Sequence, residues 1–347
     1  GFGVHLYAPF FYNNYILGAF HAYPEEVAKK LRRALYFSQE RSLKPKEVIK
    51  HYREALEVAD QMGMDPFSDE ILGIKFQLAS FFEQLQDYQR AIDVLEIVKR
   101  DCLLWVDVVG DKHWNDGQRT RVLGKTIGIS VKLGDLYTNS YVKKPDKAEE
   151  ALVWAVTTVL KEKARREKEG VKEGEGEWIN DEQMGASMEA LASHYVQRDE
   201  HYLATPLLLQ ALSHCPPKSC HSVILMNNIA TSLSQQAPPP SPAPAAANTP
   251  APPTRAVLTD QAEQWATKAL TLAASIAPPG RDPECDTGCV VATHNLGKMA
   301  ETRGNLAQAR KRYQESASLA KAIGFDDGVQ ESEEALRRLK GNQQAKA

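Results

Sequence analysis

The residues whose types could carry chemistry gather in two short stretches of the chain. They are His214, Cys215, Cys220, His221, Cys285 and Cys289. Each close pair of cysteines could form a disulfide across a turn or remain as free thiols. The first stretch also offers two cysteines and two histidines, which are ligand types of zinc, but their spacing is not that of a zinc finger. We predict two disulfides within turns, Cys215–Cys220 and Cys285–Cys289, with free thiols and a metal site as the open alternatives.

The remaining candidates for chemistry do not form a catalytic motif. The sequence has no G-x-S-x-G, no G-x-x-x-x-G-K-[ST], no H-E-x-x-H and no G-x-G-x-x-G after a strand. Its nine histidines are scattered, and Cys102 lies in an apolar helical stretch where it is predicted to be a buried core residue. We therefore expect no enzymatic activity, no cofactor and no metal centre.

The composition of the chain limits the classes of partner that it is expected to bind. The 347 residues carry 42 basic and 45 acidic side chains, a formal net charge of −3, so a surface for nucleic acid is not indicated. No stretch approaches the 18 apolar residues of a membrane-spanning helix. The aromatic segment 1-22 favours either a juxtamembrane anchor or a flap packed on the following domain.

One internal spacing recurs along a chain that otherwise shows helical periodicity and almost no strand signal. A leucine is followed thirteen positions later by a small or β-branched residue that starts a second pattern. The pairs are Leu35 and Val48, Leu78 and Ala91, Leu191 and Ala204, and Leu296 and Ala309. Small residues at this spacing let the two helices of a hairpin approach closely, as in tetratricopeptide repeats.

Two further units, around Leu133 and Ile229, match the pattern only with insertions. The spacing therefore predicts an all-α, right-handed tetratricopeptide-repeat solenoid of about six helix pairs, followed by a C-terminal capping helix over 327–340. The expected divisions are a repeat domain at 23-341, loop inserts near 107-120 and 166-181, a disordered Pro-rich insert at 237-253 and a tail at 342-347. The end of the second insert is expected to be a solvated loop.

Repeat arrays of this type bind peptides in the concave groove lined by their first helices. The repeat register places Phe37, Phe76, Ser80, Asn228 and Asn295 on that face, and they are our candidate groove residues. Aromatic rings could bury apolar side chains there, and asparagines could pair with any peptide backbone. The alternative is that the two phenylalanines pack between neighbouring hairpins. The basic and asparagine residues of a clamp for a terminal carboxylate do not assemble in either repeat frame.

Two stretches, YPEEVAKKLRRALYF (23–37) and DPFSDEILGIKFQLASFFEQLQDYQRAIDVLEIV (65–98), resemble the fungal mitochondrial tetratricopeptide adaptor of the inner-membrane i-AAA protease. The likeness is strongest over residues 20–105 and holds at the level of the repeats over 125–340. It implies a non-enzymatic adaptor that binds unfolded or membrane substrate polypeptides and delivers them to the i-AAA protease complex. It also implies a mitochondrial inner-membrane protein with its repeats in the intermembrane space, held by an N-terminal membrane segment absent from this chain.

Two other functions stay open. Another mitochondrial inner-membrane tetratricopeptide protein is tied to complex III, which makes a scaffold or assembly factor for a respiratory-chain complex the main alternative. A cytosolic co-chaperone is disfavoured because the carboxylate clamp is missing.

Overall fold

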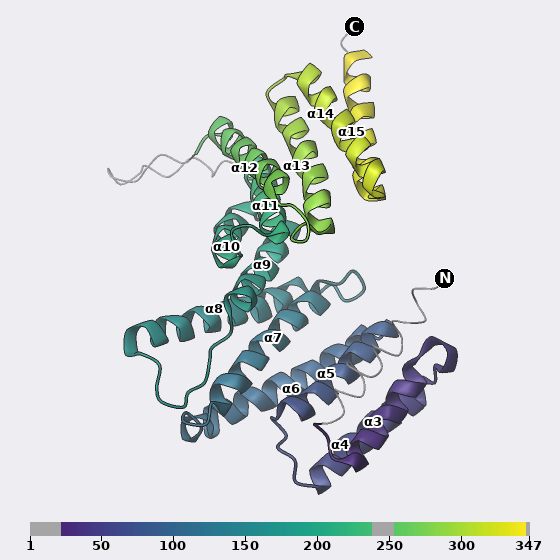
Figure 1. Cartoon of the computed structure of the whole chain (residues 1–347), viewed down its shortest axis with the longest axis vertical. Helices are drawn as coiled ribbons and strands as arrows, with labels where there is room; N and C mark the ends of the chain where they lie inside the picture. Colours follow the sequence, from purple (N-terminus) through teal and green to yellow (C-terminus); the bar gives the residue numbers. More distant parts are fainter. Residues whose placement is uncertain (1–21, 238–252, 345–347) are drawn as a thin grey trace. The chain divides into compact units, whose positions relative to one another are not determined.

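The computed structural model describes residues 22–237 and 253–344, and these form α-helices and two short 3₁₀ turns without any strand (Figure 1). The predicted all-α fold is confirmed. The helices are α3 (Glu25–Ser38), α4 (Pro45–Gln61), α5 (Asp69–Gln84), α6 (Tyr88–Val108), α7 (Gln118–Thr138), α8 (Pro145–Glu169), α9 (Asp181–Gln197), α10 (His201–His214), α11 (Cys220–Gln235), α12 (Arg255–Ser275), α13 (Pro283–Thr302), α14 (Leu306–Ile323) and α15 (Asp326–Gln344). The 3₁₀ turns are Glu40–Ser42 and Gly110–Lys112.

The order of the helices gives the predicted six pairs, from α3/α4 through α13/α14, and α15 packs on α14 as the expected capping helix. The two helices pack directly in five of these pairs, and the start of α8 shares an apolar core with α7. Proline begins α4, α8 and α13, where the first helical N–H needs no partner. Side chains cap other helices: Ser68 accepts from the Ile71 N–H at the start of α5, and Asn180 forms a capping box with Gln183 at the start of α9.

The recurrent small residues lie where the helices of a hairpin meet. Val48, Ala91, Ala204 and Ala309 have no solvent exposure. Gly297 shows the same constraint in the last hairpin, because a Cβ placed there would lie 2.7 Å from the ring of Tyr313, which is itself fully buried. The spacing found in the sequence therefore marks the close approach between the helices of each pair.

The chain divides into two compact units. The first unit comprises the described residues up to Ala151 together with Glu162–Trp178, and the second comprises Leu152–Lys161 and the described residues from Ile179 onward. Within the first unit, α5, α6, α7 and the start of α8 share one apolar core, and α3, α4 and α5 share another. Within the second unit, α11, α12 and α13 share a core, and α13, α14 and α15 share another.

The end of the second insert is an exposed loop, as the sequence predicted, with one exception at Glu175. Helix α8 continues to Glu169, and the segment after it folds back so that the Glu175 side chain is fully buried. Glu175 pairs with the guanidinium groups of Arg165 and Arg166. Burial alone would raise the pKa of the neighbouring Glu162, but hydrogen bonds from Arg165 and Arg166 hold it below its ordinary value. Paired charges thus allow one carboxylate of a charge-rich, largely exposed segment to be buried.

Trp114, in the first insert, is the centre of this packing. The Nζ of Lys172 lies 3.9 Å from its ring centroid, and the guanidinium carbons of Arg119 and Arg165 lie 4.2 and 4.8 Å away. Gly174 has a positive φ and lies directly against the backbone of Asn115, where no Cβ would fit. The two inserts of the first unit therefore form one ordered cluster held by cation–π contacts and buried ion pairs.

Two of the predicted segments lie, apart from their edges, outside the described residues: the aromatic segment 1-22 and the Pro-rich insert 237-253. In the predicted tail 342-347, residues 342–344 belong to α15 instead, and the rest lie outside the described residues. None of the helices described is both long enough and apolar enough to span a bilayer.

Candidate functional site

The two predicted aromatic groove residues lie at the edges of apolar cores in the first unit. Phe37, in the last turn of α3, is partly buried, stacks on His51 at a centroid distance of 5.8 Å and has the Lys44 ammonium 5.6 Å from its ring. Phe76, on α5, is partly buried against the core formed with α6 and α7. Phe76 therefore packs on helices of the next hairpin, as the alternative predicts, whereas these contacts of Phe37 lie within its own hairpin; the groove role of the two rings stays a prediction.

The predicted polar groove residues differ among themselves. Ser80 on α5 is exposed and Asn228 on α11 is partly exposed, so both could face a partner. Asn295 on α13 was placed on the groove face incorrectly: it is 4% exposed, and its Nδ2 donates to Thr231 Oγ1 at 3.1 Å. Its amide ties α13 to α11 and is not available to a peptide backbone.

A second tie between α11 and α13 was missed in the sequence. The Nδ2 of Asn227, a fully buried residue, donates to the carbonyl oxygen of Gly288 at 2.8 Å. A Cβ added to Gly288 would lie 2.6 Å from Val223, so the two helices are in close contact at that level. Buried amides thus fix the spacing of consecutive first helices in the second unit.

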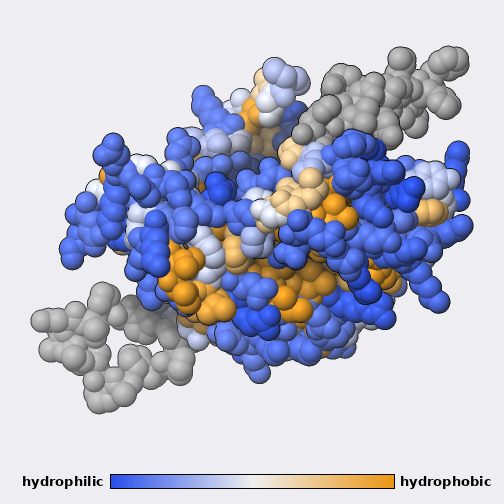
Figure 2. Space-filling model, turned by 90° about the horizontal axis from the view of Figure 1, so that it is seen from below, coloured by the Kyte–Doolittle hydropathy of each residue, from blue (hydrophilic) through white to orange (hydrophobic). Residues whose placement is uncertain are grey.

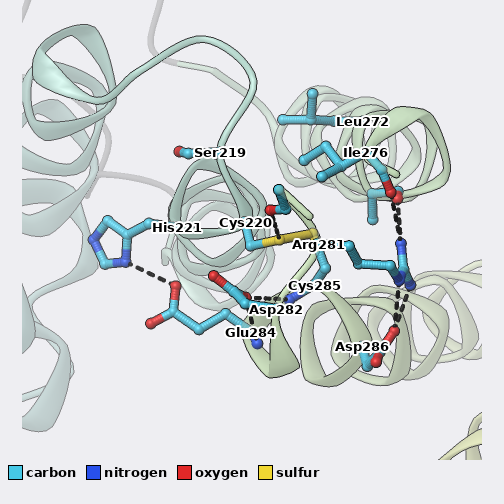
Figure 3. The surroundings of a disulfide bond; sticks show 12 residues. Ser219, Cys220, His221, Leu272, Ile276, Arg281, Asp282, Glu284, Cys285 and Asp286 are labelled. Atoms are coloured by element: carbon cyan, nitrogen blue, oxygen red, sulfur yellow. Dashed lines mark hydrogen bonds and ion pairs between the residues drawn. A yellow bond between two sulfur atoms is a disulfide. The ribbon is translucent and has the colours of Figure 1, made fainter. Parts of the chain in front are cut away.

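A disulfide joins the starts of the same two helices, and it corrects our predicted pairing. Cys220 in the first turn of α11 bonds to Cys285 in the first turn of α13, with 4.6 Å between the Cα atoms (Figure 3). Cys285 and Cys289 cannot bridge each other because they lie one turn apart on one helix, where Cβ atoms are about 5–6 Å apart instead of the roughly 4 Å that a disulfide needs. Cys215 lies before α11 with its sulfur 3.2 Å from Ser219 Oγ.

The cysteines outside this bridge are free thiols. Cys102 is buried, as the sequence predicted, and Cys215 and Cys289 are partly exposed. In the described part of the chain, no group of three histidine, cysteine or acidic residues is placed to hold a metal ion. The metal alternative for the 214–221 stretch is not supported, because Cys220 is consumed by the disulfide.

Hydrogen bonds hold the two bridged helix starts in place. Ser219 caps α11 by accepting from the Ser222 N–H, and Asp282 caps α13 by accepting from the Glu284 N–H at 2.8 Å. Arg281 donates to Asp286, which raises the pKa of the guanidinium, and also to the Ala273 carbonyl oxygen at the end of α12 (Figure 3). The residues next to the disulfide, His221 and Glu284, are thereby held at defined positions.

His221 and Glu284 border a pocket of about 400 Å³ in the second unit. It is lined mainly by α9 and by α10 with the residues that follow it, while α11 contributes two residues and α13 contributes one. The lining residues are Asp181, Glu182, Gly185, Ala186, Glu189, Ala211, His214, Cys215, Pro216, His221, Leu225 and Glu284. Four carboxylates and two histidines therefore surround a lining of small and apolar residues, and neither lysine nor arginine is among them.

The histidines that the sequence marked as metal ligands pair with these carboxylates. His214 Nδ1 lies 2.8 Å from Asp181 Oδ1, and His221 Nε2 lies 2.9 Å from Glu189 Oε2. The other ring nitrogen of His221 lies 3.5 Å from Glu284 Oε2. The two histidines considered for the metal alternative therefore pair with carboxylates instead.

Apolar side chains also reach the surface in places. On the face shown in Figure 2, hydrophobic side chains gather into patches bordered by hydrophilic ones. On α6 of the first unit, Ile97, Leu104 and Val108 are exposed and follow one side of the helix at helical spacing. Exposed apolar surface of this kind is typical of proteins that bind other polypeptides.

Comparison with known proteins identifies the kind of repeat. A TPR (tetratricopeptide) repeat-containing protein of Schizosaccharomyces pombe is 30% identical over 320 residues, which cover 91% of this chain and 79% of that protein. BtubC (BKLC) of P. vanneervenii is similar in structure with a TM-score of 0.51, at 14% identity over 86% of this chain and 91% of that one. TPR-like repeats from Podosopora anserina give a TM-score of 0.48 at 14% identity, covering 75% and 98%. No protein-family profile matches the chain.

Proposed function

Because the chain belongs to the tetratricopeptide-repeat protein family, we propose that it is a non-enzymatic adaptor for other polypeptides. We propose further that it binds unfolded or membrane substrate proteins and delivers them to the mitochondrial inner-membrane i-AAA protease. Tetratricopeptide folds serve as interaction scaffolds, and no catalytic family is indicated for this chain.

The observation that carries the adaptor role is the pocket on α9, α11 and α13. First helices contribute most of its lining, together with the end of α10, and the first helices of such arrays form the surface on which partner polypeptides bind. The specific link to the protease is supported by the resemblance of 23–37 and 65–98, which the structure places in α3 and over α5 and α6.

The disulfide supports a location in an oxidising compartment. Cys220 and Cys285 are both buried and join two separate helices, which is the arrangement of a structural bridge. Such bridges are rare in the reducing cytosol. We therefore propose that the repeats face the intermembrane space and that the protein belongs to the inner membrane.

Affinity purification from mitochondria tests this function. The chain, tagged at its C-terminus and expressed with its natural targeting, is expected to co-purify with the i-AAA protease, and its loss is expected to slow turnover of unfolded protease substrates. Recovery of respiratory-complex subunits without the protease would instead favour the scaffold function. A purely cytosolic distribution would contradict both.

A further inference from the structure

The pocket on α9, α11 and α13 combines a small, apolar lining with an unbalanced set of charges. Its carboxylates are Asp181, Glu182, Glu189 and Glu284, and no lysine or arginine lines it. Gly185, Ala186, Ala211 and Leu225 leave room between the charged groups. A long aliphatic side chain that ends in a cation fits both properties, because its stem can lie on apolar groups while its head reaches carboxylates.

The histidine contacts leave much of this acceptor capacity free. A carboxylate has two oxygens and can accept about four hydrogen bonds. One oxygen each of Asp181, Glu189 and Glu284 is engaged by a histidine, and Glu182 makes no hydrogen bond or ion pair with a described residue. The pocket can therefore accept several N–H donors from one cationic group, which suits a guanidinium or an ammonium.

Stabilisation of helix N-termini explains the presence of only some of the four carboxylates in the pocket. Asp181, Glu182 and Glu284 lie in the first turns of α9 and α13, where negative side chains stabilise the helix. Glu189 lies two turns further into α9, where this effect is absent, and its side chain is only 25% exposed. Its carboxylate contributes negative charge to the pocket without a role at a helix end.

The disulfide bond holds in place the side of the pocket that His221 and Glu284 form. His221 follows Cys220 and Glu284 precedes Cys285, so the disulfide fixes the two residues beside each other (Figure 3). A site whose charged groups are held in place loses less conformational entropy when it binds a ligand.

We propose that this pocket receives the lysine or arginine side chain of an extended partner polypeptide. The proposal rests on the adaptor function and specifies its partners: polypeptide segments with a basic residue among apolar ones. Asn228, which lies three residues after Leu225 on α11 and is partly exposed, is a candidate contact for the rest of such a segment, while the pocket selects its charge.

Peptide binding to the full chain tests the proposal. The probes are a fluorescent nonapeptide with one central arginine flanked by Leu, Ser and Gly, and the same peptide with citrulline, the neutral isostere of arginine. Arginine is expected to bind at least about tenfold more tightly than citrulline. The variant Glu189→Gln/Glu284→Gln is expected to remove most of this preference.

The matched control is Glu331→Gln/Glu334→Gln, which makes the same change in net charge on exposed positions of α15. It should retain the preference, and both variants should keep the circular dichroism spectrum and melting temperature of the parent chain. Equal affinities for the two peptides, or equal losses in the two variants, would overturn the proposal. If an unfolded substrate protein still binds the parent chain in that case, the adaptor function stands without this pocket; if it does not bind at all, the adaptor function fails.

Discussion

Breaking the bridge between Cys220 and Cys285 should lower the free energy of unfolding of the second unit by about 4 kcal/mol. The two residues are 65 positions apart. When a bridge closes a loop of that length, the chain-entropy relation gives a loss of about 14 cal/mol/K in the unfolded state, or about 4 kcal/mol at 25 °C. The five-residue loop of a Cys215–Cys220 bridge would contribute only about 2 kcal/mol by the same relation.

The perturbation is the double variant Cys220→Ala/Cys285→Ala, compared with the oxidised parent and with the parent in reductant. Both sulfurs are buried, so alanine leaves no unpaired polar group behind. For a cooperative unit of this size, 1 kcal/mol shifts the melting temperature by roughly 2–4 °C. We therefore expect the double variant and the reduced parent to melt roughly 8–16 °C below the oxidised parent.

Thermal and urea denaturation followed by circular dichroism measure the effect, and mass spectrometry of the unreduced protein identifies the bridge. The control variant Cys215→Ala/Cys289→Ala should respond to reductant as the parent does, because neither thiol is bonded. A melting temperature that is the same with and without reductant would refute the reasoning. Detection of a Cys215–Cys220 peptide pair would do the same.

Three smaller changes probe other parts of the chain. Gly297→Ala forces a methyl group against the buried ring of Tyr313 and should cost about 1–3 kcal/mol in urea denaturation. Burial lowers the pKa of His294 to about 4, so between about pH 6.5 and 4 this histidine is protonated only in the unfolded chain. The free energy of unfolding should therefore fall by up to about 3 kcal/mol as the pH drops through that range, and His294→Gln should reduce the fall. Trp114→Ala removes the ring shared by three cations, so hydrogen exchange at 170–178 should accelerate while exchange in the second unit stays unchanged.

The helix pairs could be predicted because their packing depends on residues close in sequence. Ala91, Ala204 and Ala309 recur at a fixed distance from a leucine, and each is fully buried at the contact within its own hairpin. A hairpin is a local structure, so its two helices and the small residues between them fall within one short stretch. The capping helix α15 was predicted from its own apolar residues, Val329, Leu336 and Leu339.

The disulfide could not be predicted in this way, because its partners belong to different hairpins. The sequence brings Cys215 near Cys220 and Cys285 near Cys289, and closeness along the chain suggested those pairs. Stacking of successive repeats brings the starts of α11 and α13 together across 65 residues instead. The Cys220–Cys285 pairing follows from the repeat pattern only when two facts are combined. Successive first helices lie side by side in parallel, and each of the two cysteines lies at the start of a first helix.

The burial of Glu175 within the exposed second insert was missed for a different reason. A run of mixed charges with several glycines is typical of a solvated loop, and composition alone does not distinguish charges that pair internally. Here Glu175 is buried because Arg165 and Arg166 neutralise it, and Trp114 arrives from the other insert. Only the three-dimensional contact between two separate inserts makes burial of that carboxylate favourable.

Asn227 and Asn228 show the limit of assigning groove residues from register. Successive residues on a helix differ by about 100° in direction, so one position can face the next first helix while its neighbour faces a ligand. Asn227 is buried and bonded to Gly288, whereas Asn228 is partly exposed. Asn295, selected by the same register, turns toward α11 and binds Thr231. Polar residues on first helices therefore serve two purposes, and only those with hydrogen-bonding capacity left after contacts between helices can bind a partner. In the second unit the carboxylates of the pocket beside the disulfide pair with histidines of neighbouring helices but keep oxygens free.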